Sequence, residues 1–228
     1  MSEKTISKEA IVYVVDDDPQ ACRAVSELVH SFGYQVRSYE SPEDFLANVS
    51  NDRPGCVVLD LRMPKIDGLE LNRRLMERGL NLPVVIITAY AETSVTVKSL
   101  RNGAVSVLDK PYADDDLWTF VQEAICKSEK ELRRSQHQAS LEERLRKLSP
   151  QDRAVLQLML DGQKNRTIAK RLDVSLRTVE NRRRRVFDVM EADSVAQLTR
   201  MVVEFEHNLL PKKNSNEAWL ALPFERVA

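Results

Sequence analysis

The chain has 228 residues, of which 43% are hydrophobic and 30% charged, so it is long enough for two small domains that each bury a core. No apolar run approaches the roughly 20 residues that span a bilayer, and the polar N-terminal segment lacks the apolar stretch of a signal peptide. We therefore expect a cytoplasmic protein that does not bind membranes. Its three cysteines lie far apart, which excludes disulfide or zinc spacing and indicates reduced structural thiols.

The net charge of −1 conceals an uneven distribution of charge along the chain. Asp16, Asp17 and Asp18 lie near the start, whereas an uninterrupted basic run, Arg182 to Arg185, lies near the end. An acidic site in one half and a basic patch in the other indicate two separate functions.

Short apolar runs alternate with helix-period segments through the first half of the chain. The runs predict strands at 11–15, 34–39, 56–59, 84–87 and 105–108, with helices at 21–32, from Ser41-Pro42 onward, at 69–78 and at 93–102. This order predicts an α/β fold, a doubly wound five-stranded parallel sheet covered by helices on both faces. In such a fold the ligand site lies beyond the carboxyl ends of the strands.

The second half contains helical patterns and no strand pattern. A helix that opens at Asp114 closes the first domain, and the charged segment after it, with sparse leucines, predicts a helical linker or a short coiled coil. Helices from Pro150, Thr167, Arg177 and Ser194 then predict a small all-α domain of four helices. The expected limits are a first domain at 9–126, a linker at 127–147, a second domain at 148–206 and a flexible tail at 207–228.

Polar residues follow four of the predicted strands. They are Asp16, Asp17, Asp60, Thr88 and Lys110. Because the carboxyl ends of parallel strands share one edge of the sheet, we expect these side chains to converge. Clustered carboxylates need a cation, and Mg²⁺ suits such a site because it also accepts a phosphate oxygen. A carboxylate nucleophile, a divalent metal, a hydroxyl and an ammonium are the groups that an acyl phosphate requires.

The segments VYVVDDDP, VVLDLRMPKIDGLEL, VVIITAY and VSVLDKPY resemble, in this order, the receiver domains of two-component response regulators. The resemblance covers residues 9–126 and implies that a sensor histidine kinase phosphorylates Asp60. It also implies that Asp17, Asp60 and the backbone carbonyl of Arg62 bind Mg²⁺ directly, while Asp16 acts through water.

The same resemblance assigns the remaining residues of the acidic site. Thr88 and Lys110 would contact the phosphoryl group, and the peptide bond from Lys110 to Pro111 would be cis. One position departs from the family, which usually has Phe or Tyr three residues before the lysine as a ring that turns inward on activation. This chain has Val107 there, so signal transfer would depend more on backbone shifts.

The segment from Asn165 to Arg185 predicts a helix-turn-helix motif. At 100° per residue, one face of its second helix is apolar and belongs to the core. That face holds Val179, Val186 and Met190. Groove-facing and flanking polar residues are expected to contact bases and phosphates of DNA. They are Arg177, Thr178, Asn181, Arg182, Arg184 and Arg185.

The stretch LSPQDRAVLQLMLDGQKNRTIAKRLDVSLRTVENRRRRVFDVM resembles the LuxR-type DNA-binding domain, and the whole chain resembles the NarL/FixJ group of response regulators. This implies binding to double-stranded DNA as a homodimer formed on phosphorylation, with a dimer contact on the last helix. Where the family commonly has an apolar residue and then histidine, this chain has Asn181 and Arg182. Its target sequence therefore cannot be inferred from the family.

Three alternatives compete with this interpretation. A phosphatase with an aspartate nucleophile usually has a second carboxylate two residues on, where this chain has Arg62, so we do not expect an enzyme. A DNA-binding regulator that needs no phosphorylation stays open because of Val107. The arginine-rich helix could also be the solvated face of an ordinary helical bundle.

Overall fold

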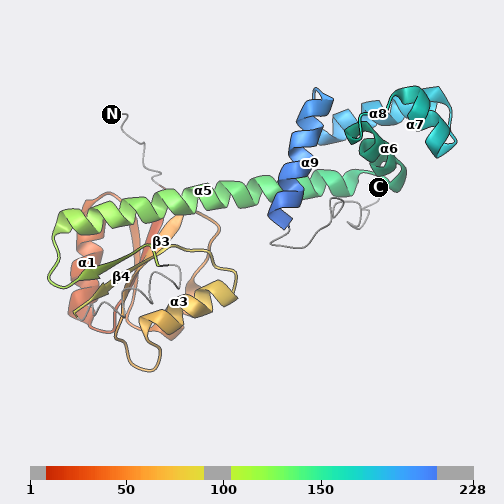
Figure 1. Cartoon of the computed structure of the whole chain (residues 1–228). Coiled ribbons are helices and arrows are strands. Elements are labelled where there is room, and N and C mark those ends of the chain that lie inside the picture. Colours follow the sequence, from red (N-terminus) through yellow and green to blue (C-terminus); the bar gives the residue numbers. More distant parts are fainter. Residues whose placement is uncertain (1–8, 90–103, 210–228) are drawn as a thin grey trace. The chain divides into compact units, whose positions relative to one another are not determined.

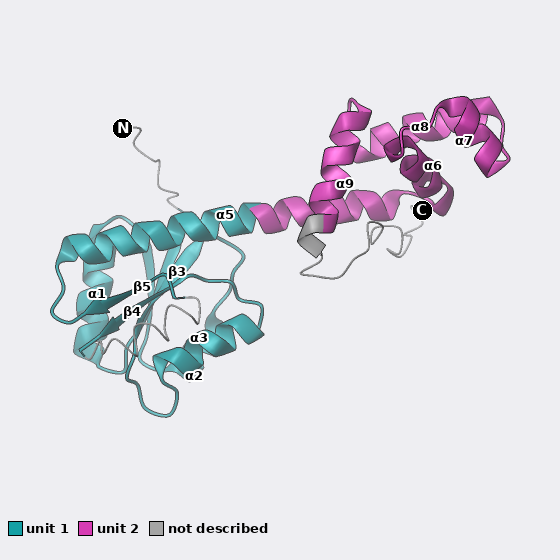
Figure 2. Ribbon diagram, in the orientation of Figure 1, with its two compact units in different colours: residues 1–133 teal, residues 134–228 magenta. Residues whose placement is uncertain are grey.

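The protein consists of two compact units that divide between Arg133 and Arg134, drawn in teal and magenta in Figure 2. The structure, a computed structural model, describes residues 9–89 and 104–209 (Figure 1). The predicted helix at 93–102 and most of the predicted tail lie outside these residues. No helix in the described part of the chain is both long enough and apolar enough to cross a membrane.

Unit 1 is built on a sheet whose described strands are all parallel and run in the order β2-β1-β3-β4-β5. The strands are β1 (Ile11–Val15), β2 (Gln35–Tyr39), β3 (Gly55–Asp60), β4 (Val84–Thr88) and β5 (Ser106–Asp109). β1, β3 and β4 are buried nearly throughout because both of their faces are covered, whereas β2 lies at an edge and is largely exposed. The predicted α/β doubly wound sheet is confirmed.

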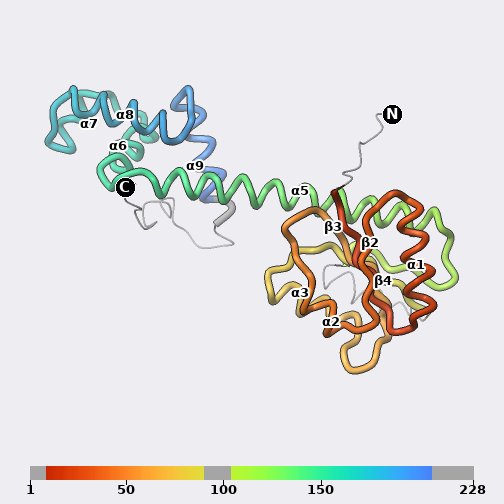
Figure 3. The backbone as a smooth tube through the Cα atoms, turned by 180° about the vertical axis from the view of Figure 1, so that it is seen from behind, coloured from red at the N-terminus to blue at the C-terminus, as the bar shows by residue number. Residues whose placement is uncertain are grey.

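Helices cover the two faces of this sheet, and Figures 1 and 3 show α5 and α3 on opposite sides of the strands. The helices are α1 (Pro19–Ser31), α2 (Pro42–Asn48), α3 (Gly68–Glu77) and α5 (Asp114–Lys147). Because strand side chains alternate between faces, Val12 and Val14 pack in the core with α1 and α5, whereas Ile11 and Tyr13 pack in the core with α2 and α3.

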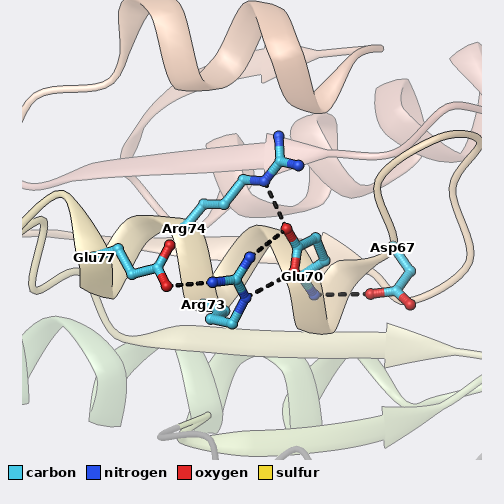
Figure 4. Close-up of polar contacts among 5 residues, drawn as sticks. All are labelled: Asp67, Glu70, Arg73, Arg74 and Glu77. Carbon is cyan, nitrogen blue, oxygen red and sulfur yellow. Dashed lines mark hydrogen bonds and ion pairs between the residues drawn. The ribbon is translucent and has the colours of Figure 1, made fainter.

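Side chains fix the starts of three of these helices, and the cap at Ser41 is the one that the sequence predicts. Asp18, Ser41 and Asp67 each accept a hydrogen bond from a backbone N–H in the first turn of their helix. On α3, Glu70 accepts hydrogen bonds from both Arg73 and Arg74 (Figure 4). These bonds lower the pKa of Glu70 to about 2. Ion pairs between side chains of the same helix therefore stabilise α3 on its exposed face.

Unit 2 is all helical in its described part and has a core of its own. Its helices are α6 (Pro150–Leu160), α7 (Asn165–Leu172), α8 (Leu176–Met190) and α9 (Val195–Leu209). α6 begins with a capping box, in which Ser149 and Asp152 exchange hydrogen bonds between side chains and backbone. The four predicted helices of the second domain are thus present.

The segment predicted as a linker is the continuation of α5. Near the start of the predicted linker, the Ser128 hydroxyl accepts a hydrogen bond from the backbone N–H of Gly55, at the beginning of β3. Near its end, Leu141 and Leu145 are buried in the core of unit 2. These leucines therefore serve that core rather than the coiled-coil seam that was the alternative.

Candidate functional site

The sheet brings the predicted acidic site together at one edge. Asp16 follows β1, Asp60 ends β3 and Lys110 follows β5, and in the sheet β3 lies next to β1 and is separated from β5 only by β4. The Lys110 Nζ lies 3.2 Å from Asp16 Oδ2 and 2.8 Å from Asp60 Oδ1. Thr88 ends β4 between them, buried, and its backbone carbonyl accepts a hydrogen bond from the Lys110 N–H at 2.8 Å. Asp17 follows Asp16 directly in the chain, but the side chain of Asp17 is exposed.

Backbone amides hold the two converging carboxylates in place. Asp60 Oδ2 accepts a hydrogen bond from the N–H of Arg62 at 2.7 Å. Asp16 Oδ1 accepts one from the N–H of Asp18 at 2.9 Å, and Asp16 is only 5% exposed. Both carboxylates are therefore oriented before any phosphoryl group or metal binds.

The charges of this site are strongly coupled. Burial raises the pKa of Asp16, and the hydrogen bond from the Asp18 amide and the charge of Lys110 offset this only in part. Burial also disfavours the Lys110 ammonium, but its hydrogen bond to Asp60 and the charges of Asp16 and Asp60 outweigh that effect and raise the pKa of Lys110. The amine of Lys110 therefore stays protonated, and carboxylates still outnumber cationic groups at this edge of the sheet.

The donors fit a magnesium ion by their chemistry. No group of three His, Cys, Asp or Glu side chains within 9–89 and 104–209 is arranged to hold a metal. Mg²⁺, however, is usually bound by one or two carboxylates together with waters and phosphate oxygens. The carboxylates of Asp16 and Asp60, which both contact the Lys110 ammonium, could bind such an ion either directly or through its waters.

Two further expectations concern β5. The Lys110-Pro111 peptide bond is cis, as the resemblance implies. Val107 lies opposite Ile86 in the sheet and packs, half-buried, against the core that α2 and α3 cover. It has no ring that could move between an outward and an inward position.

The turn between α7 and α8 sets the start of the second helix of the motif. α7 ends at Asp173, whose φ of 52° is left-handed, and Ser175 then caps α8 by accepting a hydrogen bond from the N–H of Thr178. The Thr178 hydroxyl lies 2.8 Å from Ser175 Oγ. The structure therefore places Thr178, a predicted DNA contact, in the helix cap.

The faces of α8 divide as helical phase predicts. Val179, Val186 and Met190 are fully buried, which confirms the predicted core face. The side chains predicted to enter the major groove are all exposed. They are Arg177, Asn181 and Arg184.

The arginines of α8 differ in their intramolecular contacts. Arg185 Nε lies 3.4 Å from the buried Asp152 carboxylate of α6, and Arg183 lies over the ring of Phe187. Among the described residues, none of the other arginines of α8 forms an ion pair. The positive charge on the outer face of α8 is therefore available to a polyanion.

Two exposed residues of the same region were not selected from the sequence. Leu176, the first residue of α8, is 41% exposed, and Glu180 lies next to Asn181 on the outer face. The 100° phase that selected Arg177 and Asn181 also selects Glu180, but a search for basic residues overlooks an acidic one.

Comparison with known proteins agrees with this two-part architecture. Residues 12–122 match the family model of the response regulator receiver domain, and residues 146–202 match that of the bacterial regulatory proteins of the luxR family. The response regulator protein TmoT of Ectopseudomonas mendocina is 31% identical over 202 residues, which are 89% of this chain and 92% of that protein. The transcriptional regulatory protein FixJ of Azorhizobium caulinodans is 35% identical over 193 residues, 84% of this chain and 91% of that protein.

Solved structures agree as well. The response regulator StyR matches with a TM-score of 0.81 at 29% identity, over 86% of this chain and 99% of that one. Full-length FixJ from B. japonicum matches with a TM-score of 0.52 at 32% identity, over 86% of this chain and 97% of that one. The chain therefore belongs to the NarL/FixJ group of response regulators, transcription regulators in which a receiver domain is joined to a LuxR-type DNA-binding domain.

Proposed function

We propose that Asp60 accepts a phosphoryl group from a sensor histidine kinase, and that this modification switches dimerisation and DNA binding by unit 2. The observation that carries the proposal is the position of the Lys110 ammonium, which bonds to the carboxylates of both Asp16 and Asp60. An oxygen of Asp60 attacks phosphorus and displaces the histidine of the kinase. Lys110 and the Thr88 hydroxyl then contact the phosphoryl oxygens, so the reaction depends on positioning and charge neutralisation.

Receiver domains bind Mg²⁺ for this reaction, and Asp16, Asp17, Asp60 and the backbone carbonyl of Arg62 would hold the ion here. When bound, Mg²⁺ neutralises charge on the phosphoryl oxygens. Asp16 is nearly buried, and its burial raises its pKa, so a bound cation would favour its ionised form. Asp17 has an exposed side chain that is free to turn toward the ion.

For the output, the exposed Arg177, Asn181 and Arg184 enter the major groove, where arginine suits guanine and asparagine suits adenine. Arg182 and Arg185 contact phosphates, and Thr178 acts through the cap of α8. In a homodimer two copies of α8 lie about one DNA turn apart. The domain limits at 9–126 and 148–206 and a cytoplasmic location are part of this proposal.

Two features bear on the alternatives. Arg62 stands where an aspartate-dependent phosphatase carries its general acid, so we propose no enzymatic turnover of an external substrate. Val107 keeps open a regulator that binds DNA without phosphorylation, because it lacks the ring through which the family reports activation. The acidic pair, Thr88 and Lys110 argue against that alternative.

The experiment that tests the proposal is sedimentation of the full chain with Mg²⁺, with and without beryllofluoride, which mimics a phosphoryl group. The wild type should change from monomer to dimer, and Asp60→Ala should not. A dimer in both proteins would contradict the role of Asp60. A monomer throughout, with unchanged DNA affinity, would favour the regulator that needs no phosphorylation.

A further inference from the structure

The exposed face of α8 carries one acidic side chain among its polar and basic ones. Arg177, Glu180, Asn181 and Arg184 recur at i, i+3, i+4 and i+7 and are all exposed. This spacing places them in one stripe along the helix, opposite the buried Val179. We infer that Glu180 reads a cytosine in the major groove, an inference that rests on the proposed DNA binding by α8.

The usual role of such a glutamate would be to pair with arginines of its own helix. α3 provides that case, because Glu70 bonds to Arg73 and Arg74, three and four residues further on (Figure 4). Glu180 has the same opportunity, because arginines lie three and four residues after it and a further one lies three residues before it. Among the residues that the structure describes, it forms an ion pair with none of these three. Its carboxylate is therefore available to a donor outside the protein.

DNA offers one base that suits a carboxylate. The phosphates repel a carboxylate, so Glu180 reduces affinity unless a base edge donates a hydrogen bond to it. In the major groove, cytosine presents its N4 amino group as a donor. Adenine places the N7 acceptor beside its amino group, a pattern that suits the amide of Asn181 better. Guanine and thymine present acceptors, which exclude a carboxylate.

The position of Glu180 along α8 agrees with base contact. The N-terminal residues of a recognition helix approach the base edges. Glu180 is the fifth residue of the helix and lies between Arg177 and Arg184, two predicted groove residues. The acidic side chain and the arginines of this stripe would therefore contact the same half-site.

The test is selection of bound duplexes from a library with about 20 randomised base pairs, enough for two half-sites one turn apart. The full chain, with Mg²⁺ and beryllofluoride, is compared with Glu180→Gln. In the wild type, one position of each half-site should favour cytosine by about 5- to 150-fold. Glu180→Gln, whose amide suits adenine, should lose that preference or replace it with adenine.

A matched control separates base reading from charge. Asp188→Asn removes the same charge from the same helix, at an exposed position about 12 Å further along its axis. It should raise affinity for every sequence without changing the selected site. Equal melting temperatures of the three proteins would show that the substitutions leave the fold intact, because both side chains are exposed.

Each other outcome has a distinct meaning. If the wild type and Glu180→Gln select the same site and differ only in overall affinity, as Asp188→Asn does, the inference is wrong and DNA binding by α8 stands. If the variant changes a base other than cytosine, the inference is also wrong. If the wild type selects no sequence at all, the proposed function fails, and the inference with it.

Discussion

Asp152 is expected to stabilise unit 2 more than any exposed charge on its surface. Its carboxylate is only 4% exposed and accepts hydrogen bonds from both the N–H and the hydroxyl of Ser149. It also faces Arg185 of α8 at 3.4 Å. A single buried group thus fixes the start of α6 and ties that helix to α8.

The effect of Asp152→Ala follows from these contacts. Loss of a helix cap costs about 1 kcal/mol, and loss of hydrogen bonds to a buried charge costs about 1.5–3 kcal/mol, but the two effects overlap. The ion pair adds about 0.5 kcal/mol, because Arg185 is 57% exposed and regains water when it is released. We therefore expect unit 2 to lose about 2 kcal/mol of unfolding free energy.

Amide hydrogen exchange of the full chain, followed by mass spectrometry, measures this loss unit by unit. Slowly exchanging peptides of α6 and α8 should exchange about 30-fold faster, because 1.4 kcal/mol corresponds to a factor of ten. Peptides of α1, in unit 1, serve as the internal control and should not change. Arg185→Met alone should change exchange by less than about threefold. An equally small change in Asp152→Ala would refute the reasoning.

Three other changes test particular contacts. Gly68→Ala would place a Cβ 2.8 Å from the carbonyl oxygen of Asp60, so unit 1 should lose about 1–3 kcal/mol in urea unfolding and react more slowly with acetyl phosphate. Gly79→Ala, which has open space but a φ of +70°, should leave that reaction unchanged. Ser128→Ala would leave the buried N–H of Gly55 without its acceptor and should cost unit 1 about 1–3 kcal/mol, measured in the same way. Arg182→Ala, which removes a proposed phosphate contact, should reduce the salt dependence of DNA binding by about one unit of slope, which titration at several salt concentrations measures.

The sheet could be predicted because the apolar pattern that indicates each strand lies within the residues of that strand. A strand buried on both faces, such as Val84–Thr88, must be apolar along its whole length, and polar residues that follow such strands must meet at one edge. Asp60 and Lys110, fifty residues apart, could therefore be placed together without any knowledge of their contacts. The buried face of α8 could be predicted for the same reason, since its period is a local property.

Other features depend on contacts between distant segments and could not be predicted. The sequence assigns Arg185 to a phosphate on charge alone and does not indicate that it also lies 3.4 Å from a carboxylate of α6. It places Thr178 among the DNA contacts and does not indicate that the Thr178 hydroxyl lies at the cap formed by Ser175. Each side chain has a second partner of suitable chemistry within the protein, and the sequence alone does not reveal that partner.

α5 shows the same limit over a longer stretch. The leucines of α5 after Lys127 are widely spaced. This spacing fits a linker, a coiled coil or a helix that packs on its own domain, because all three kinds of helix can bury only a few apolar residues along one face. The contacts decide: Ser128 belongs to unit 1 through Gly55, whereas Leu141 and Leu145 complete the core of unit 2. A fragment cut at the predicted limit of 148 would thus lose two buried leucines, each of which typically stabilises a core by about 2–5 kcal/mol. The two compact units divide between Arg133 and Arg134, so their boundary falls within α5, ahead of these leucines.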